Sequence, residues 1–178
     1  MMACEQMPGM SVLEHGNSVH RYFMDLMGHV LEGRPLVYEW KLPGWAKEPA
    51  LWEKTTSLEV MRLYQTYHDC GKPVCREIDA DGRVHFPNHA SVSASMWRSM
   101  GGDEAVARLI ERDMDIHLLK AEGLQSFLDQ PEAPTLLLTG LAEIHSNASM
   151  FGGIESTSFK MKWKQIDQRG KQITAKLK

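Results

Sequence analysis

The 178-residue sequence lacks several features that would assign it to a special class. It contains no apolar run close to the ~18 residues that a membrane-spanning helix requires, so we expect no membrane association. Residues 1–16 lack the basic region and apolar run of a signal peptide. There are only three cysteines, without paired spacing: Cys4, Cys70 and Cys75. Together these absences predict a cytoplasmic protein without a disulfide framework.

What remains is the composition of an ordinary globular chain, with 43% hydrophobic and 24% charged residues. We expect residues 1–16 to be a loosely ordered lead-in and residues 17–178 to form a single domain. The net charge of −3 combines +6 over residues 159–178 with −9 over the rest of the chain. A basic end on an acidic body predicts a local anion-binding surface.

The spacing of apolar residues predicts an all-α fold. Helical periodicity is found over residues 17–33, 58–69, 104–120, 124–128 and 136–148. Residues 33–50 contain prolines, glycines and two tryptophans without a clean period, and we expect an insertion loop there. Residues 159–164 fit both a strand and a helix. The basic C-terminal segment 159–178 is therefore expected either to continue the helical bundle or to form a short β or irregular extension.

The stretch His68-Asp69-Cys70-Gly71-Lys72-Pro73 is the most informative part of the sequence. The adjacent His68 and Asp69 fall in the last turn of a predicted helix and point inward. Imidazole and carboxylate groups both donate lone pairs to divalent cations, so the pair is a candidate metal site. The alternative is a buried His–Asp hydrogen bond with no metal.

Four further side chains on separate predicted helices point toward the core and could complete such a site: His20, His89, Asp113 and His145. His29 lies on the other edge of the first helix and is the second choice for the first ligand. Glu143 is expected to point away from the buried face, because it lies about 200° from Leu141 around the helix. Histidines at the edge of a core are often purely structural.

In chain order, His20, His68-Asp69, His89, Asp113 and His145 resemble the HD-domain metal-dependent phosphohydrolase superfamily. The specific part is His68-Asp69-x-Gly71-Lys72-Pro73, and Phe86-x-x-His89 is similar to the family's next segment. The resemblance covers about residues 17–148 and implies an HD-type helical bundle. It also implies one or two divalent ions (Mn, Ni, Co, Zn, Fe or Mg) bound by these residues. The chain departs from the family at Asp113, where many members have histidine, and at His145, in the late aspartate position.

Within the superfamily, the string 143–147 and the Ser/Lys-rich end look similar to the HD domains fused to RNA-repair polynucleotide kinases. Those domains remove 2′,3′-cyclic or terminal phosphates. This chain has no Gly-x-x-x-x-Gly-Lys-Ser/Thr loop of a kinase. The resemblance implies a phosphohydrolase or phosphodiesterase acting on nucleotides or RNA ends, with Asp69 orienting a metal-bound water and Lys72 neutralising phosphate charge. Further substrate-binding donors would be His117, Ser158, Lys160, Lys164 and Arg169.

Two other functions remain open from the sequence. One is a nucleotidase or deoxynucleotide triphosphohydrolase, which needs a pocket closed around a free nucleotide. The other is a non-catalytic HD-like module that binds nucleotide or RNA through its basic end. The sequence leaves open whether the chain forms a homo-oligomer.

Overall fold

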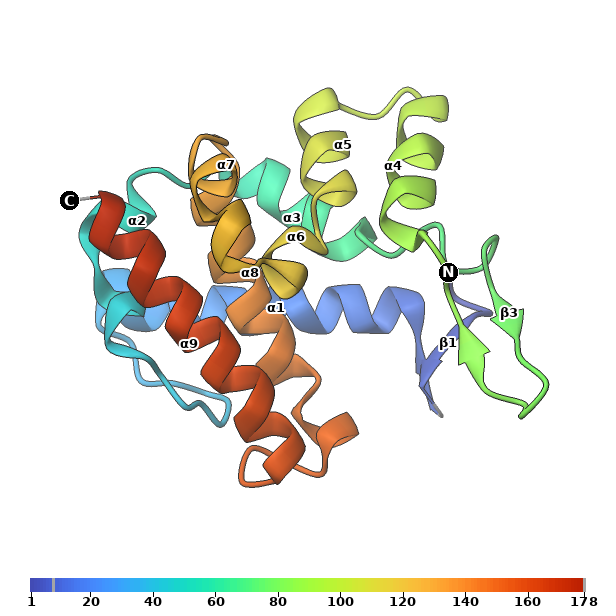
Figure 1. Cartoon of the computed structure of the whole chain (residues 1–178), viewed down its shortest axis with the longest axis horizontal. Coiled ribbons are helices and arrows are strands. Elements are labelled where there is room, and N and C mark those ends of the chain that lie inside the picture. The colour runs from blue at the N-terminus through green and yellow to red at the C-terminus, as the bar shows by residue number, and fades with distance from the viewer. Residues whose placement is uncertain (8, 178) are drawn as a thin grey trace.

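The computed structural model describes residues 1–7 and 9–177, and helices account for most of it (Figure 1). This confirms the expected all-α fold. The helices are α1 (Val12–Glu32), α2 (Pro49–Trp52), α3 (Leu58–Tyr67), α4 (His89–Ser99), α5 (Glu104–Glu111), α6 (Asp115–Leu118), α7 (Leu124–Leu128), α8 (Ala133–Ser146) and α9 (Thr157–Leu177). Two small antiparallel hairpins are β1 (Glu5–Met7) with β2 (Met10–Ser11), and β3 (Glu77–Ile78) with β4 (Val84–His85). In the described part of the chain, no helix combines the length and apolar character needed to cross a bilayer.

Helix α1 begins earlier than the apolar pattern predicts. Ser11 is its N-cap: its side chain accepts a hydrogen bond from the Glu14 backbone, and Glu14 bonds back to the Ser11 backbone. The predicted start at residue 17 is therefore wrong, and β1, β2 and the first turn of α1 lie within residues 1–16, for which the sequence predicted a lead-in. The expected end at Gly33 is confirmed by its left-handed φ of 70°.

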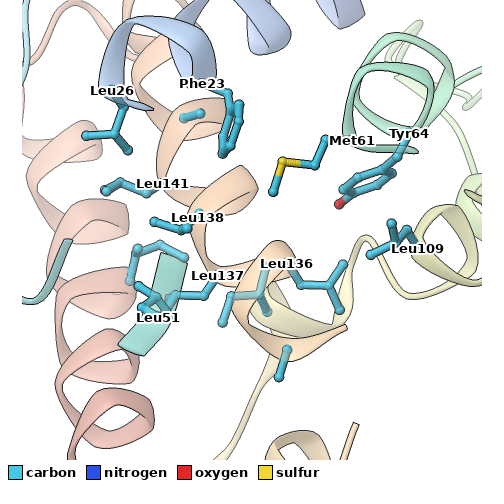
Figure 2. Close-up of a cluster of buried hydrophobic side chains, with 14 of the residues drawn as sticks. Phe23, Leu26, Leu51, Met61, Tyr64, Leu109, Leu136, Leu137, Leu138 and Leu141 are labelled. Carbon is cyan, nitrogen blue, oxygen red and sulfur yellow. The ribbon is translucent and has the colours of Figure 1, made fainter. Parts of the chain in front are cut away.

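Helix α8 is the centre of the hydrophobic core. Its residues Leu136, Leu137 and Leu138 are consecutive and point to different sides, yet all three are completely buried. Figure 2 shows these leucines and Leu141 among side chains from α1, α3 and α5. These neighbours are Phe23, Leu26, Met61, Tyr64 and Leu109. A helix enclosed on nearly every side has no solvent face to which a polar residue could be assigned.

The C-terminal segment is the long helix α9, so the alternative of a β or irregular extension is wrong. Phe159, Ile166 and Ile173 recur every seven residues and are buried against the core. The insertion loop 33–50 packs onto this helix, because Trp45 Nε1 donates to Asp167 Oδ1 at 3.2 Å. Trp40 Nε1 donates to Asp25 Oδ2 of α1 at 2.9 Å. The loop tryptophans thus cover the core.

The predicted single helix over 104–120 is interrupted. Helix α5 ends at Glu111 and α6 begins at Asp115, so Asp113 lies in the turn between them. Helix α8 also begins at Ala133 and not at residue 136, with Pro134 in its first turn, where a missing backbone N–H costs nothing. The break after α5 lets the chain turn Asp113 inward independently of His117.

The first prediction concerns Gly16, where α1 crosses the end of α3. A Cβ at this position would collide with the Thr66 carbonyl and lie 2.9 Å from Gln65 O. We expect Gly16→Ala to lower the free energy of unfolding by about 1–3 kcal/mol, measured by urea denaturation. The control Gly44→Ala, where a Cβ meets nothing within 4 Å, should change it by less than ~0.5 kcal/mol. Equal stability of the two variants would contradict this packing.

Candidate metal centre

His68 and Asp69 lie in the turn that follows α3, and a close backbone approach holds this turn in place. Gly71 N donates to Ser93 Oγ of α4 at 2.8 Å, and a Cβ on Gly71 would lie only 2.6 Å from Ser93 N. Lys72 N closes the turn by donating to Asp69 O at 3.0 Å. Glycine at 71 therefore allows α4 to pack directly on the turn, and both His68 and Asp69 are buried.

Asp69 is surrounded by three imidazole rings from three different elements. His15 Nε2 of α1 lies 3.6 Å from Asp69 Oδ2, and His68 Nε2 lies 3.3 Å from the same oxygen. His89 Nε2, at the start of α4, lies 3.6 Å from Asp69 Oδ1. One donor atom each from His15, His68 and Asp69 falls within 4.8 Å of the other two, which is a spacing suited to a metal ion.

Several buried polar atoms at this point have no hydrogen-bond partner among the described residues. They are both ring nitrogens of His15, His68 Nε2 and Asp69 Oδ1. His68 Nδ1 donates to Gln65 O at 2.9 Å, which fixes the ring with Nε2 facing Asp69. Unpaired buried polar atoms each cost about 1–3 kcal/mol, so such a group calls for a common partner. Imidazole nitrogens with a carboxylate oxygen fit a divalent transition metal.

Glu143 extends the cluster from α8 toward α6. Its Oε1 lies 3.9 Å from His15 Nε2, and its Oε2 accepts a hydrogen bond from His117 Nε2 at 2.9 Å. Asp113 is also buried nearby, where its Oδ1 accepts a hydrogen bond from Tyr64 OH at 2.6 Å. Three carboxylates and four imidazoles, counting His89 and His117, therefore gather between α1, α3, α4, α6 and α8.

The electrostatics of the cluster differ from one histidine to the next. Burial, together with the charge of His68, lowers the pKa of His15 to about 4, so at neutral pH the ring is uncharged and one of its nitrogens has a free lone pair. Burial also acts to lower the pKa of His68, but the carboxylates of Asp69 and Asp113 outweigh it and raise that pKa to about 10. Burial acts to raise the pKa of Asp69, yet His68 and Lys72 hold it below its ordinary value.

The same balance applies at Glu143. Burial would raise its pKa, but the neighbouring His117 and His68 lower it well below the usual range. Asp113 behaves differently, because burial and the nearby carboxylate of Glu143 keep its pKa raised in spite of His68. Without a metal ion, the cluster thus holds ionised Asp69 and Glu143 beside a neutral His15 and a protonated His68, and a divalent ion bound by His68 would replace that proton.

The structure brings together some of the side chains predicted from the sequence and separates others. His68, Asp69, His89 and Lys72 meet in the cluster, and Asp113 and His117 join it through Tyr64 and Glu143. His20 does not, because it follows His15 by five residues and projects about 140° away around α1. Its Nδ1 bonds Gln65 Oε1 at 2.8 Å. His29, the second choice, bonds Arg34 O at 2.9 Å.

His145 also lies outside the cluster, although it is buried as predicted. Its Nδ1 donates to Leu141 O at 2.7 Å, and its Nε2 accepts from Lys41 N at 3.1 Å. The ring packs against Trp40, with 4.4 Å between centroids. Because the backbone occupies both nitrogens, His145 fixes the insertion loop to α8.

The predicted substrate-binding residues of the C-terminal segment have other positions. Arg169 donates to the carbonyls of Ile116, His117 and Leu119 and closes the end of α6. Lys160 pairs with Glu155 at 2.7 Å. Ser158 and Lys164 are exposed on α9, and no hydrogen bond or ion pair in the described structure joins them to the cluster.

Two members of the cluster, His15 and Glu143, were not predicted from the sequence. The signal for His15 is the capping-box spacing Ser11-x-x-Glu14, which starts α1 at Val12 and puts His15 in its first turn. Glu143 does point away from Leu141, but α8 is buried on that side too, so its carboxylate meets His15 and His117 and not solvent. No periodicity within α8 could reveal this.

Comparison of the chain with protein-family models, with curated proteins and with solved structures found no match. The resemblance to the HD superfamily therefore stays a prediction. What the cluster can do chemically follows from its own geometry: it is a largely enclosed set of nitrogen and oxygen donors, in which the side chains of Lys72, Glu143, His89 and His117 are 10% to 21% exposed.

The second prediction tests the support of Asp113. Tyr64→Phe removes the hydroxyl that donates to its buried carboxyl group, and we expect the free energy of unfolding to fall by about 1–3 kcal/mol. Tyr67→Phe on the same helix is the matched control, because the Tyr67 hydroxyl makes no hydrogen bond with the described residues. Thermal or urea unfolding of both variants provides the measurement. Similar losses in both would show that the Tyr64–Asp113 bond contributes little.

Proposed function

We propose that the protein is a metal-dependent phosphoric ester hydrolase acting on nucleotides or RNA ends. The observation that carries this proposal is the group of unpaired buried atoms on His15, His68 and Asp69. Stability alone does not account for unpaired atoms on three neighbouring buried side chains, whereas a bound divalent ion could take one ligand atom from each of them. The motif His68-Asp69-x-Gly71-Lys72 and its resemblance to the HD superfamily supply the class of reaction.

His15, His68 and Asp69 would hold the ion, with Glu143 and His89 close enough to complete its surroundings. A divalent metal in such a site supplies a nucleophilic water of lowered pKa and polarises the phosphoryl oxygen. The protein itself would orient the side chains that hold the ion. The bond from His68 Nδ1 to Gln65 O fixes one ring, and the bond that Glu143 accepts from His117 Nε2 fixes the carboxylate that faces His15.

Lys72 and His89 are suited to meet the phosphate. Their side chains are 10% and 18% exposed, whereas His15 and His68 are at most 2% exposed. Glu143 and His117 are also partly exposed, at 17% and 21%, but they are hydrogen-bonded to each other, so we assign the phosphate to Lys72 and His89. Lys72 Nζ lies 2.6 Å from Asp69 Oδ2 and can bring its charge to a phosphoryl oxygen beside that carboxylate. Asp69 would orient the attacking water.

A cytoplasmic location is part of the proposal. The three cysteines, one of them within the His68–Pro73 turn, are all free thiols. Cys70 is buried against Ser93 O at 3.5 Å, where burial raises the pKa of its thiol. Free thiols without partners fit a reducing compartment.

The third prediction separates the metal ligands from neighbouring histidines. His15→Asn should weaken manganese or zinc binding by at least about tenfold, because it removes an uncharged imidazole that has no other partner. His20→Asn, one turn further along the same helix and engaged with Gln65, should bind metal as the wild type does. Metal analysis after equilibrium dialysis gives the measurement. The reverse result would place the first ligand at His20.

The fourth prediction concerns the reaction. Asp69→Ala should reduce metal-dependent release of phosphate or opening of 2′,3′-cyclic phosphate by at least about a thousandfold. The substrates are nucleoside 2′,3′-cyclic phosphates, 3′-phosphorylated oligonucleotides and p-nitrophenyl phosphate. Asp81→Ala, on the exposed β3–β4 turn, is the control for loss of one carboxylate. Full activity of Asp69→Ala would contradict the proposed function. A wild type inert with manganese, nickel and zinc would instead favour a nucleotide- or RNA-binding module.

A further inference from the structure

A cavity of about 920 Å³ lies next to the cluster. Its walls come from the first six residues, from the loop Pro73–Arg76 after the cluster turn, and from Val84 and Phe86 at the end of β4. In Figure 1, β1 and the β3 hairpin stand beside each other at the end of the molecule that is remote from the C-terminus. The volume is typical of pockets for small organic ligands.

Two side chains connect this cavity to the cluster. Lys72 Nζ donates to Gln6 Oε1, in the cavity wall, at 2.8 Å and to Asp69 Oδ2 at 2.6 Å. The carbonyl of Phe86, another wall residue, accepts from His89 Nδ1 at 3.1 Å. Lys72 and His89 of the cluster therefore lie directly behind two wall residues of the cavity, Gln6 and Phe86.

The cavity offers a cation and an aromatic ring. Arg76 is exposed and forms no ion pair or hydrogen bond with the described residues, unlike Arg83 in the turn between β3 and β4, which lies 3.7 Å from Asp81. Its guanidinium is permanently charged and matches the geometry of a phosphate. The ring of Phe86 lies 5.4 Å from Lys72 Nζ and is partly buried. Glu5, the acidic wall residue, accepts from Gly9 N at 3.4 Å.

We infer that this cavity binds the nucleoside and second phosphate of a substrate whose first phosphate lies at the cluster. The inference rests on the proposed function, because it takes the cluster as the place of hydrolysis. Phe86 stacks on the base, which is a sequence-tolerant contact, and Arg76 binds the second phosphate. The substrate class is therefore a nucleotide with two phosphates on its sugar, such as the 3′-terminal nucleotide of an RNA, whose 5′ phosphate continues the chain.

Other ligand classes use these groups less well. A nucleoside monophosphate would place its only phosphate at the cluster and leave Arg76 without a partner. An inorganic or simple alkyl phosphate would leave Phe86 without a stacking partner. Only a ligand with a ring and two separated anionic groups engages Lys72, Phe86 and Arg76 together.

The test compares two probes in calorimetric titrations of the full chain in EDTA, so that no ester is hydrolysed. The probes are adenosine 3′,5′-bisphosphate and adenosine 3′-monophosphate. Arg76→Gln should weaken binding of the bisphosphate roughly tenfold and leave the monophosphate within about twofold. Arg83→Gln removes the same charge from the neighbouring β3–β4 turn and should change the binding of neither probe.

Phe86→Leu should weaken the binding of both probes roughly tenfold. Phe86→Tyr keeps the aromatic ring and should bind both probes as the wild type does. Thermal melts of each variant separate loss of binding from loss of folding. If Phe86→Leu fails to fold, the comparison of Arg76→Gln with Arg83→Gln decides alone.

Equal effects of Arg76→Gln and Arg83→Gln would overturn the inference, as would a wild type that binds neither probe. Hydrolysis of p-nitrophenyl phosphate with added manganese is measured in parallel. If hydrolysis proceeds while Arg76→Gln does not selectively weaken bisphosphate binding, the pocket assignment is wrong and the proposed phosphohydrolase activity is retained. If binding follows the expected pattern and no ester is hydrolysed, the assignment of the binding pocket is retained and the proposed hydrolysis is wrong.

Discussion

The burial of the Asp69 carboxylate is the constraint on which the rest of the site depends. A buried charge is costly unless other charges and donors surround it. Lys72 supplies a direct ion pair at 2.6 Å, and imidazoles from His15, His68 and His89 enclose the other directions. These groups come from α1, the turn after α3, and α4. Lys72 and His68 are local to the turn, but the enclosure is complete only when α1 and α4 pack on it, which links the chemistry of the site to the stability of the bundle.

Small residues make this enclosure possible. Gly16 lets α1 pass against the carbonyls of Gln65 and Thr66, and Gly71 lets the turn meet Ser93 of α4. Both contacts exclude a Cβ, and each lies next to a ligand candidate: Gly16 follows His15, and Gly71 lies two residues beyond Asp69. Close helix approach thus sets the distances within the cluster, and a larger side chain at either position would move the imidazoles apart.

His15 and His145 show how the same residue type serves two purposes. Both are buried and both have a pKa lowered to about 4, chiefly by burial. His145 uses its two nitrogens to bond Leu141 O and Lys41 N, and its ring packs on Trp40. Neither nitrogen of His15 has a partner in the described structure. Burial alone therefore does not identify a ligand; what distinguishes the two rings is whether the protein itself satisfies their nitrogens.

The sequence by itself determined the helical class, the inward-facing His68-Asp69 pair, the turn at Gly71 and the position of His89, because each depends on local spacing or on a single residue's conformational preference. It also contained the capping box that starts α1, although the apolar pattern predicted that this helix begins at residue 17. Only the tertiary structure decided that His15 and Glu143 join the cluster while His20 and His145 do not. Periodicity gives the direction of a side chain relative to its own helix, and the packing of other helices decides what that side chain meets.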